Sequence, residues 1–201
     1  MLPEELSATK SIKLVNRLLP INSKDDIPTN WRNTPFEDFI GIHNFDSPIE
    51  SSDNPRLLIV SCIEFRFSLR IPSGFSYVIR TPGGRLTNLP GAEFAMAYIL
   101  AKGVRHIALV GHNDCGMTKV FESTQKLQNA LMEQGWDATR AQTFIDSHSS
   151  KFAIDDEIDS LKDEFNNLRK DFQNIEIAPL FASLKSNRLH YPQWYISQQI
   201  D

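Results

Sequence analysis

Apolar residues along the chain fall into the short runs typical of strands and the three-and-four spacing typical of helices. Continuous apolar runs at Leu57–Ser61 and His106–Val110 indicate strands that are covered on both faces. Phe75–Arg80 predicts a further strand, and Gly91–Lys102 predicts a helix that precedes the strand at His106–Val110. Strand, helix and strand in this order form a right-handed crossover. We therefore expect an α/β fold with a central, mainly parallel β-sheet flanked by α-helices.

In the N-terminal quarter, apolar side chains at helical spacing predict a helix over Leu6–Leu19, which Pro20 ends. The following stretch is interrupted by prolines and contains one short predicted helix, at Phe36–Ile40. A solitary helix with a proline-rich connector buries little apolar surface by itself. We expect residues 1–54 to form an N-terminal helical arm and connector that lies across its own domain or a partner subunit, and residues 55–201 to form the α/β domain.

The C-terminal part of the chain is predicted to be mostly helical. A helix is expected to begin near Cys115, with Asn113 or Asp114 as its N-cap, and to run towards Gly135. The remaining expected elements are helices at Asp155–Phe172 and Ile177–Lys185 and a last strand at Trp194–Ser197.

The first of these later helices is strongly charged. Its apolar residues recur every three or four positions and predict a core stripe of Ile158, Leu161, Phe165, Leu168 and Phe172. Its first turn is acidic, with Asp155, Asp156, Glu157 and Asp159. We interpret these four acids as solvated groups that the helix dipole favours, rather than as a metal site.

Composition and charge narrow the classes of function. With 201 residues, 41% of them hydrophobic and 23% charged, the chain is expected to form one globular domain with terminal extensions. Its net charge of −4 and the lack of a basic run argue against nucleic acid as a partner. The start of the chain, Met1–Leu6, differs from a signal peptide, and no apolar stretch is long enough to span a bilayer. We therefore expect a cytoplasmic protein without a membrane role, in which two cysteines indicate a metal or catalytic site more than a disulfide.

Side chains suited to chemistry follow the carboxyl ends of the predicted strands. Cys62 comes after the first strand, Arg80 ends the second, and His112 and Cys115 follow the third. Ligands of open parallel sheets bind at this edge, so we expect these residues to converge. Two thiolates and one imidazole suit a zinc ion held tetrahedrally, with the fourth position free for water. Such an ion lowers the pKa of its bound water and creates a hydroxide nucleophile.

Glu64 and Arg66 follow Cys62 at alternate positions. If the segment is extended, both side chains point to the same side. Arg66 could then hold Glu64 ionised in a fixed orientation, and the carboxylate could accept a hydrogen bond from zinc-bound hydroxide. An arbitrary surface pair of this kind would contribute little, so it is the position beside Cys62 that favours a catalytic role.

These motifs give the chain a specific resemblance. Cys62–Arg66, followed by His112–Cys115, resembles the Cys-x-Asp-x-Arg and His-x-x-Cys pattern of the beta-class carbonic anhydrase family. Val78–Gly84 and Gly91–Ala95 are similar to two segments that lie between those motifs in the family. The resemblance covers roughly residue 55 to the C-terminus.

The resemblance implies a zinc lyase. It implies Cys62, His112 and Cys115 as zinc ligands and Arg66 as the partner of the acid. The implied activity is the reversible hydration of carbon dioxide to bicarbonate by a zinc-bound hydroxide. The family also implies a homodimer or a multiple of dimers, in which N-terminal helices embrace the neighbouring subunit. The residues we expect at the substrate pocket are Arg80, Gly83, Gly84, Phe65 and Tyr77.

Two departures from the family pattern leave alternatives open. The acid is Glu64 instead of Asp, longer by one methylene, so it could orient the hydroxide or reach the metal and close its fourth position. Thr81–Gly84 replaces the family's Asn-Ala-Gly-Asn at the rim of the pocket. One alternative is a catalytically weak or silent zinc-binding homologue. Another is a hydrolase of a carbon dioxide analogue such as carbonyl sulfide or carbon disulfide, and a more remote one is a redox thiol pair.

Overall fold

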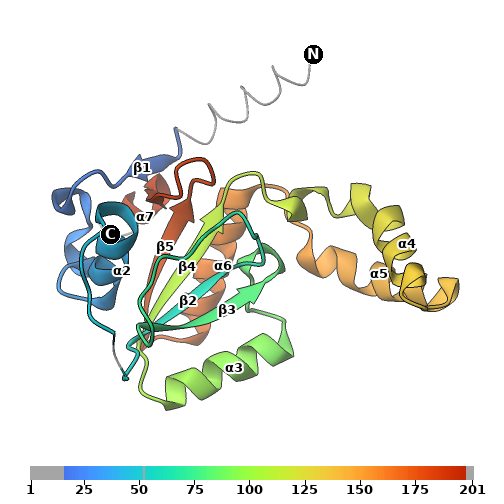
Figure 1. Ribbon diagram of the computed structural model, residues 1–201, viewed down its shortest axis with the longest axis horizontal. Coiled ribbons are helices and arrows are strands. Elements are labelled where there is room, and N and C mark those ends of the chain that lie inside the picture. The colour runs from blue at the N-terminus through green and yellow to red at the C-terminus, as the bar shows by residue number, and fades with distance from the viewer. Residues whose placement is uncertain (1–15, 52, 198–201) are drawn as a thin grey trace.

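One six-stranded sheet organises the chain (Figure 1). The structure is a computed structural model that describes residues 16–51 and 53–197. Its strands are β1 (Leu18–Pro20), β2 (Leu57–Cys62), β3 (Ser76–Thr81), β4 (His106–His112), β5 (Glu176–Ala182) and β6 (Leu189–Pro192). Their order is β1-β6-β5-β4-β2-β3, in which β3, β2, β4 and β5 run parallel and the β6 and β1 pairings are antiparallel. The predicted α/β fold with a mainly parallel sheet is confirmed.

Most of the helices flank this sheet, and the others project away from it (Figure 1). The helices are α2 (Pro35–Phe45), α3 (Pro90–Ala101), α4 (Thr124–Glu133), α5 (Ala138–Phe152), α6 (Glu157–Asp171) and α7 (Gln193–Ser197). α6 packs on β4 and β5, α2 contacts β4 and β6, and α3 lies along the edge strand β3. The helices predicted around Phe36–Ile40 and Gly91–Lys102 are therefore confirmed. Within the described ranges, no helix is long and apolar enough to cross a membrane.

The centre of the sheet is buried as its sequence predicts. Every residue of β2 is buried, in keeping with its continuous apolar run. A side chain at Gly111 in β4 would meet the ring of Phe181 at 3.2 Å and Leu161 of α6 at 3.5 Å. The missing Cβ therefore lets α6 pack closely beside the end of β4. The predicted core stripe of α6 is confirmed at its four buried members, Ile158, Leu161, Phe165 and Leu168, with Phe172 partly buried against the core.

Helices α4 and α5 form a hairpin that projects from the body of the molecule (Figure 1). At the base of the hairpin, the amide of Ile154 donates to the carbonyl of Met117 at 3.2 Å and joins its two ends. No residue of α4 is buried, and α5 buries only Ala141, Ile145 and Ser149. The base of the hairpin packs against the carboxyl ends of the central strands, while its helices contribute little to the core.

The predicted N-terminal helix is wrong at its C-terminal end. Leu18–Pro20 forms β1, an edge strand that pairs with β6. Both leucines pack against the core in this extended conformation, so tertiary packing overrides their helical spacing. The part of the predicted helix up to residue 15 lies outside the described residues.

Much of the predicted connector belongs to the main core. Ile21, Trp31 and Phe36 are buried in one cluster with the central strands. The hydroxyl of Tyr195 accepts hydrogen bonds from Trp31 Nε1 at 2.9 Å and from the side-chain amide of Asn30 at 3.0 Å. This stretch therefore packs onto the α/β body, and the division of the chain at residue 54 stays a prediction.

Two predictions near the C-terminus give the wrong type of secondary structure. Ile177–Lys185, predicted as a helix, lies mostly in β5, and Trp194–Ser197, predicted as a strand, lies in α7. A continuous apolar run fits a strand buried on both faces as well as it fits a helix, and Pro179 disfavours the helix. The strand tolerates Pro179 because pairing with β6 begins only at Phe181. Pro192 ends β6, and α7 follows directly.

The helix predicted from Cys115 begins later than expected. Two short 3₁₀ turns, Gly116–Lys119 and Phe121–Ser123, precede α4. Neither expected N-cap residue is free for that role, because the side chain of Asn113 accepts the Leu184 amide at 2.8 Å and Asp114 is in the left-handed conformation. The helix α5 has no counterpart among the predicted elements.

Candidate metal centre

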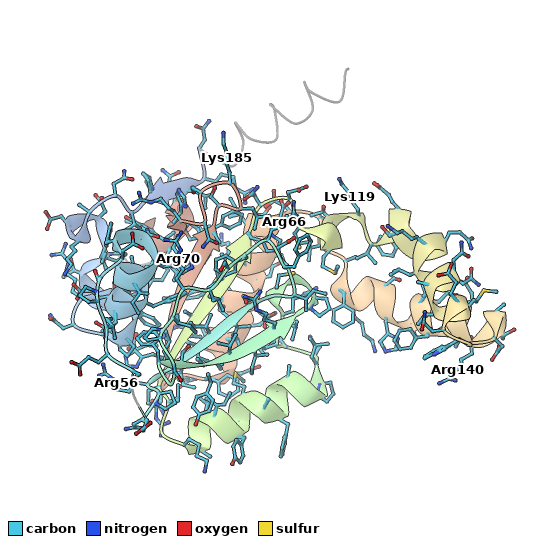
Figure 2. All side chains as sticks on the ribbon, viewed as in Figure 1. Arg56, Arg66, Arg70, Lys119, Arg140 and Lys185 are labelled. Atoms are coloured by element: carbon cyan, nitrogen blue, oxygen red, sulfur yellow. The ribbon has the colours of Figure 1, made fainter. Side chains whose placement is uncertain are left out.

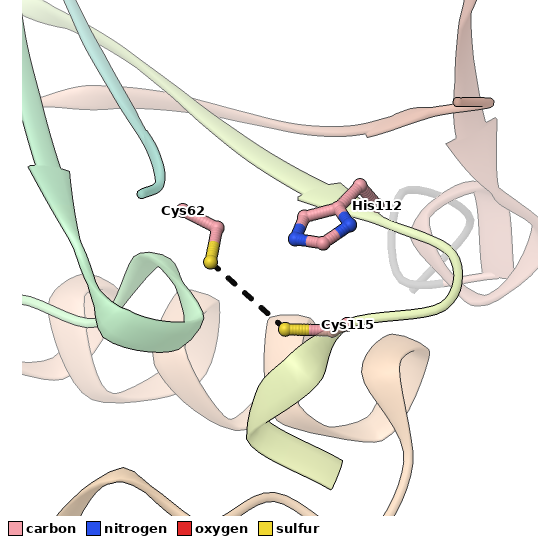
Figure 3. Close-up of side chains that lie close together, drawn as sticks. All are labelled: Cys62, His112 and Cys115. Atoms are coloured by element: carbon pink, nitrogen blue, oxygen red, sulfur yellow. Dashed lines mark hydrogen bonds between the residues drawn. The ribbon is translucent and has the colours of Figure 1, made fainter. Parts of the chain in front are cut away.

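Cys62, His112 and Cys115 lie together at the carboxyl edge of the sheet (Figure 3). Cys62 ends β2 and His112 ends β4, and these strands are parallel neighbours, so their last residues reach the same edge. Asp114 has a φ of 53°, and this left-handed turn directs the chain back so that Cys115 joins the other two. All three ligand side chains are buried. The predicted convergence of two thiols and one imidazole is present.

The spacing of these side chains fits a tetrahedral metal ion. The two Sγ atoms are 3.9 Å apart, neither cysteine forms a disulfide, and the three ligand atoms lie within 4.8 Å of one another. Two sulfurs bound to one tetrahedral zinc would be about 3.8 Å apart, given the usual Zn–S bond length. The observed separation therefore fits two ligands of one ion and far exceeds the roughly 2 Å of a disulfide bond.

The imidazole of His112 has one nitrogen engaged and the other available. Nδ1 donates to the carbonyl of Asn113 at 2.9 Å, which leaves the lone pair on Nε2. Nε2 is buried and has no hydrogen-bond partner among the described residues. Because a buried polar atom without a partner is costly, a cation at this point would satisfy Nε2.

The same group of side chains favours an ionised thiol. The hydrogen bond from Cys115 lowers the pKa of Cys62, and His112 lowers it further. The same contact, together with burial, raises the pKa of Cys115. One thiolate is thus stabilised by the neighbouring thiol, and a dication would supply the charge that allows both to ionise.

Glu64 is a neighbour of the three candidate metal ligands but does not belong to that group. Arg66 Nε donates to Glu64 Oε1 at 2.8 Å, Arg66 Nη2 donates to Oε2 at 2.7 Å, and the Arg66 amide donates to Oε1 at 2.8 Å. The hydrogen bonds from the Arg66 side chain lower the pKa of Glu64 to about 2, so the acid is ionised. The expected pair is formed through a turn after β2 rather than through an extended segment.

Arg66 also connects the two segments that carry the metal ligands. Its Nη1 donates to Asp114 Oδ2 at 2.8 Å, and its Nη2 donates to the Asp114 carbonyl at 3.0 Å. Figure 2 places Arg66 at the end of the sheet, near Lys119 at the base of the hairpin. The Arg66 side chain is 41% exposed, so these contacts fix geometry more than they add stability.

Arg80, expected at the substrate pocket, braces the loop that carries Glu64. Its Nη1 donates to the carbonyls of Cys62 at 3.2 Å and Glu64 at 3.1 Å, and its Nη2 donates to the carbonyl of Phe67 at 3.2 Å. The guanidinium also lies over the ring of Phe67, 5.8 Å from its centre. Arg80 thereby fixes the backbone on both sides of the acid, and its role towards a substrate stays a prediction.

The other four residues expected at the pocket are only partly brought together. Gly83 and Gly84 form the turn after β3, and a Cβ on Gly84 would lie 3.4 Å from the amide nitrogen of Cys62, so the turn approaches the ligand strand closely. Phe65 follows Glu64 but is 92% exposed. Tyr77 lies near the start of β3, away from the edge that carries the metal ligands. Their roles in substrate binding stay predictions.

A buried carboxylate behind the centre was missed by the sequence analysis. The interpretation of the first turn of α6 as solvated is wrong for Glu157, which is only 4% exposed and accepts the amide of Cys115 at 3.3 Å. Asp156 is the N-cap of α6 and accepts the amides of Ile158 and Asp159. The position of Glu157 in the sequence could have indicated its burial. It precedes Leu161 by four residues and thus falls on the apolar face of the helix.

Comparisons with known proteins were made for both sequence and structure. No protein-family model matches the sequence, and no curated protein matches it significantly. Among solved structures, a beta-carbonic anhydrase of Trichomonas vaginalis is similar over 74% of this chain and 88% of its own, with a TM-score of 0.56 and 22% identity.

Two further solved structures have the same architecture. A carbon disulfide hydrolase in its apo form is similar over 74% of this chain and 83% of its own, with a TM-score of 0.53 and 17% identity. A carbonic anhydrase of Streptococcus mutans is similar over 78% of this chain and 96% of its own, with a TM-score of 0.51 and 19% identity. The likeness is one of architecture, and the chain therefore has the fold of the beta-carbonic anhydrases.

Proposed function

We propose that this chain is a zinc enzyme that catalyses the reversible hydration of carbon dioxide to bicarbonate. The observation that carries the proposal is the buried group of Cys62, His112 and Cys115, whose sulfur spacing and unpartnered Nε2 fit a tetrahedral ion with one open position. Zinc, when bound, supplies a Lewis acid that makes water nucleophilic near neutral pH. The fold shared with carbonic anhydrases supports the proposal.

The residues around the metal centre have different roles in the proposed reaction. The two cysteines and His112 hold the ion, and all three side chains are buried. The ionised carboxylate of Glu64 accepts a hydrogen bond from the attacking water and so orients it. Arg66 holds that carboxylate with a two-pronged contact, which a planar guanidinium provides and an ammonium does not.

Glu64 also separates an active enzyme from a silent zinc-binding homologue. A carboxylate that coordinated the ion would close its fourth position. In the structure, both oxygens of Glu64 are instead engaged by Arg66, and the carboxylate lies outside the ligand group. This arrangement supports an open position and therefore an active centre.

A hydrolase of carbon disulfide or carbonyl sulfide is the second candidate. The similarity to a carbon disulfide hydrolase supports it, because one fold accommodates both chemistries. Both substrates are linear molecules with an electrophilic carbon, as carbon dioxide is, so the same nucleophile would serve. Parallel assays with the three substrates distinguish the candidates by their kcat/KM values.

We also propose that the chain acts as a homodimer or a multiple of dimers in the cytoplasm. Phe94 and Tyr98 on α3 are 75% and 58% exposed, and Val78 on the adjacent edge strand β3 is exposed too. Apolar side chains gathered on one face are typical of surfaces that pair with another protein. Two free thiols, with no disulfide, are consistent with a reducing compartment.

Substitution of the ligands tests the proposed function. Wild-type protein is expected to contain one zinc per chain and to hydrate carbon dioxide, whereas Cys62→Ala and His112→Ala should lose both zinc and activity. His148→Ala, on the projecting hairpin, is the control and should keep both. A zinc-loaded, well-folded wild type that shows no hydration at any pH would exclude this function.

A further inference from the structure

Helix α6 has two buried carboxylates on the face that packs against the sheet. Glu157 and Glu164 are one heptad apart and only 4% and 2% exposed. Buried carboxylates require hydrogen-bond donors, and here backbone amides of two loops supply them. Glu164 accepts the amides of Leu86 and Thr87 at 2.7 and 2.9 Å and the hydroxyl of Thr87 at 2.7 Å, so it fixes the loop after β3.

Glu157 makes the corresponding contact to the metal centre. Its Oε1 accepts the amide of Cys115 at 3.3 Å, and the bond is buried. Cys115 lies at the end of a tight turn in which Arg66 holds Asp114 and the side chain of Asn113 accepts the Leu184 amide. The Glu157 bond reaches the amide of Cys115 itself. Ile154, three residues before Glu157, packs against the side chains of both cysteines. The start of α6 is thus the rear wall of the centre.

We propose that Glu157 is a positioning residue for the metal: through the Cys115 amide it fixes the turn that presents the third ligand. The proposal rests on the proposed zinc site but not on the activity of that site. Hydrogen-bond partners behind metal ligands typically contribute roughly 10- to 100-fold in metal affinity, because they hold the ligands in the geometry that the ion requires. The acceptor oxygen is the essential feature here, since a backbone amide needs only an acceptor.

Two variants of similar size distinguish the effect of losing the hydrogen bond from the effect of losing the buried charge. Glu157→Met fills the space and removes the acceptor, whereas Glu157→Gln keeps a carbonyl oxygen and removes the charge. Zinc affinity, measured by competition with a chromophoric chelator, should fall roughly 10- to 100-fold in Glu157→Met and stay within a few-fold of wild type in Glu157→Gln. The visible absorption bands of the cobalt-substituted protein should change only in Glu157→Met.

Glu164→Met is the matched control, because it removes a buried carboxylate of the same helix that bonds to no metal ligand. It should lower the free energy of unfolding while leaving zinc affinity and the cobalt spectrum near those of wild type. Equal zinc affinity and an unchanged cobalt spectrum in folded Glu157→Met would overturn the inference, as would an equal loss of affinity in Glu157→Gln. A wild type that binds no zinc would instead overturn the proposed function, so the two failures are distinguishable.

Discussion

Arg66 holds the carboxylate of Glu64 through two parallel side-chain hydrogen bonds of 2.8 and 2.7 Å, and its amide adds a third bond to the same group. The acid is only 9% exposed, whereas the arginine reaches solvent and the turn at Asp114. Glu64 is one methylene longer than the aspartate of the family pattern, and Arg66 holds it in a defined position. We call these contacts between Arg66 and Glu64 the clamp. This clamp predicts how the activity responds when either partner is changed.

Arg66→Lys should lower the rate of carbon dioxide hydration by roughly 100-fold while zinc content stays the same. A lysine ammonium cannot make the two-pronged contact, so the carboxylate loses its orientation by an amount that such sites do not tolerate. Stopped-flow hydration assays and metal analysis measure the two quantities. Arg70→Lys is the control, because Arg70 forms an exposed ion pair with Asp46, at 3.2 Å, rather than with Glu64. Equal rates in wild type and Arg66→Lys would contradict the role of the clamp.

Glu64→Asp tests whether this acid is adapted to its site. Shortening the side chain withdraws the carboxylate from the Arg66 guanidinium, so we expect kcat/KM for carbon dioxide to fall by about 10-fold or more. The measurement is steady-state hydration at several carbon dioxide concentrations with zinc-loaded protein. A rise of activity from near zero in Glu64→Asp would favour the silent homologue instead.

Zinc removal should lower the stability of the wild-type fold. A ligand that binds only the folded state stabilises it, by about 4 kcal/mol when free zinc is at 1,000 times its Kd. Urea unfolding with and without zinc measures the difference. Cys62→Ala lacks one thiolate and should show a much smaller effect of zinc. The same effect of zinc in both proteins would show that the ion binds elsewhere.

His43 predicts an acid-sensitive stability that is independent of the metal centre. Its side chain is buried between Phe39 and Phe67, and neither ring nitrogen has a hydrogen-bond partner among the described residues. Burial, and to a smaller extent the charge of Arg70, lowers the pKa of His43 to about 4. The unfolded chain, with an ordinary histidine pKa near 6.5, takes up a proton at a higher pH than the folded one does.

The contribution of His43 to the free energy of unfolding should therefore be fully present above pH 6.5. It should decrease by about 3 kcal/mol as the pH falls towards 4. Urea unfolding at a series of pH values measures the slope, and His43→Phe should flatten it. His148→Phe, on the hairpin, is the control and should keep the wild-type slope. An unchanged slope in His43→Phe would show that another group causes the acid sensitivity.

Phe94→Glu should convert an oligomer to a monomer. The residue is one of the most exposed apolar side chains of α3, and a charge in a buried subunit interface is costly. Sedimentation velocity measures the change. Leu127→Glu, at an exposed apolar position of α4, should not alter the oligomeric state. A monomeric wild type, or an oligomer that persists in Phe94→Glu, would contradict the proposed interface.

The central strands and the convergence of the two cysteines with His112 could be predicted because each depends on local sequence. β2 and β4 are continuous apolar runs, and a parallel sheet brings their ends to one edge regardless of the rest of the fold. β5 could not be assigned in the same way. Its apolar run is ambiguous between strand and helix, and pairing with the neighbouring strands β4 and β6 decides the outcome.

Glu157 could not be recognised because its environment is made by a distant segment. In sequence it is one acid among four at a helix start, and the dipole would favour all of them equally. Its burial depends on the Cys115 turn, which is 42 residues away in the chain. The turn that joins Glu64 to Arg66 was likewise not foreseen, since the extended alternative satisfies the same spacing.

Zinc titration of the metal-free protein, followed by carbon dioxide hydration, tests the central claim most directly. We expect no activity without zinc, a linear rise up to one equivalent per chain, and a plateau beyond it. The site residues Cys62, His112 and Cys115 would then be the origin of the activity. A protein that binds one zinc per chain and remains without hydration activity at full occupancy would contradict the claim.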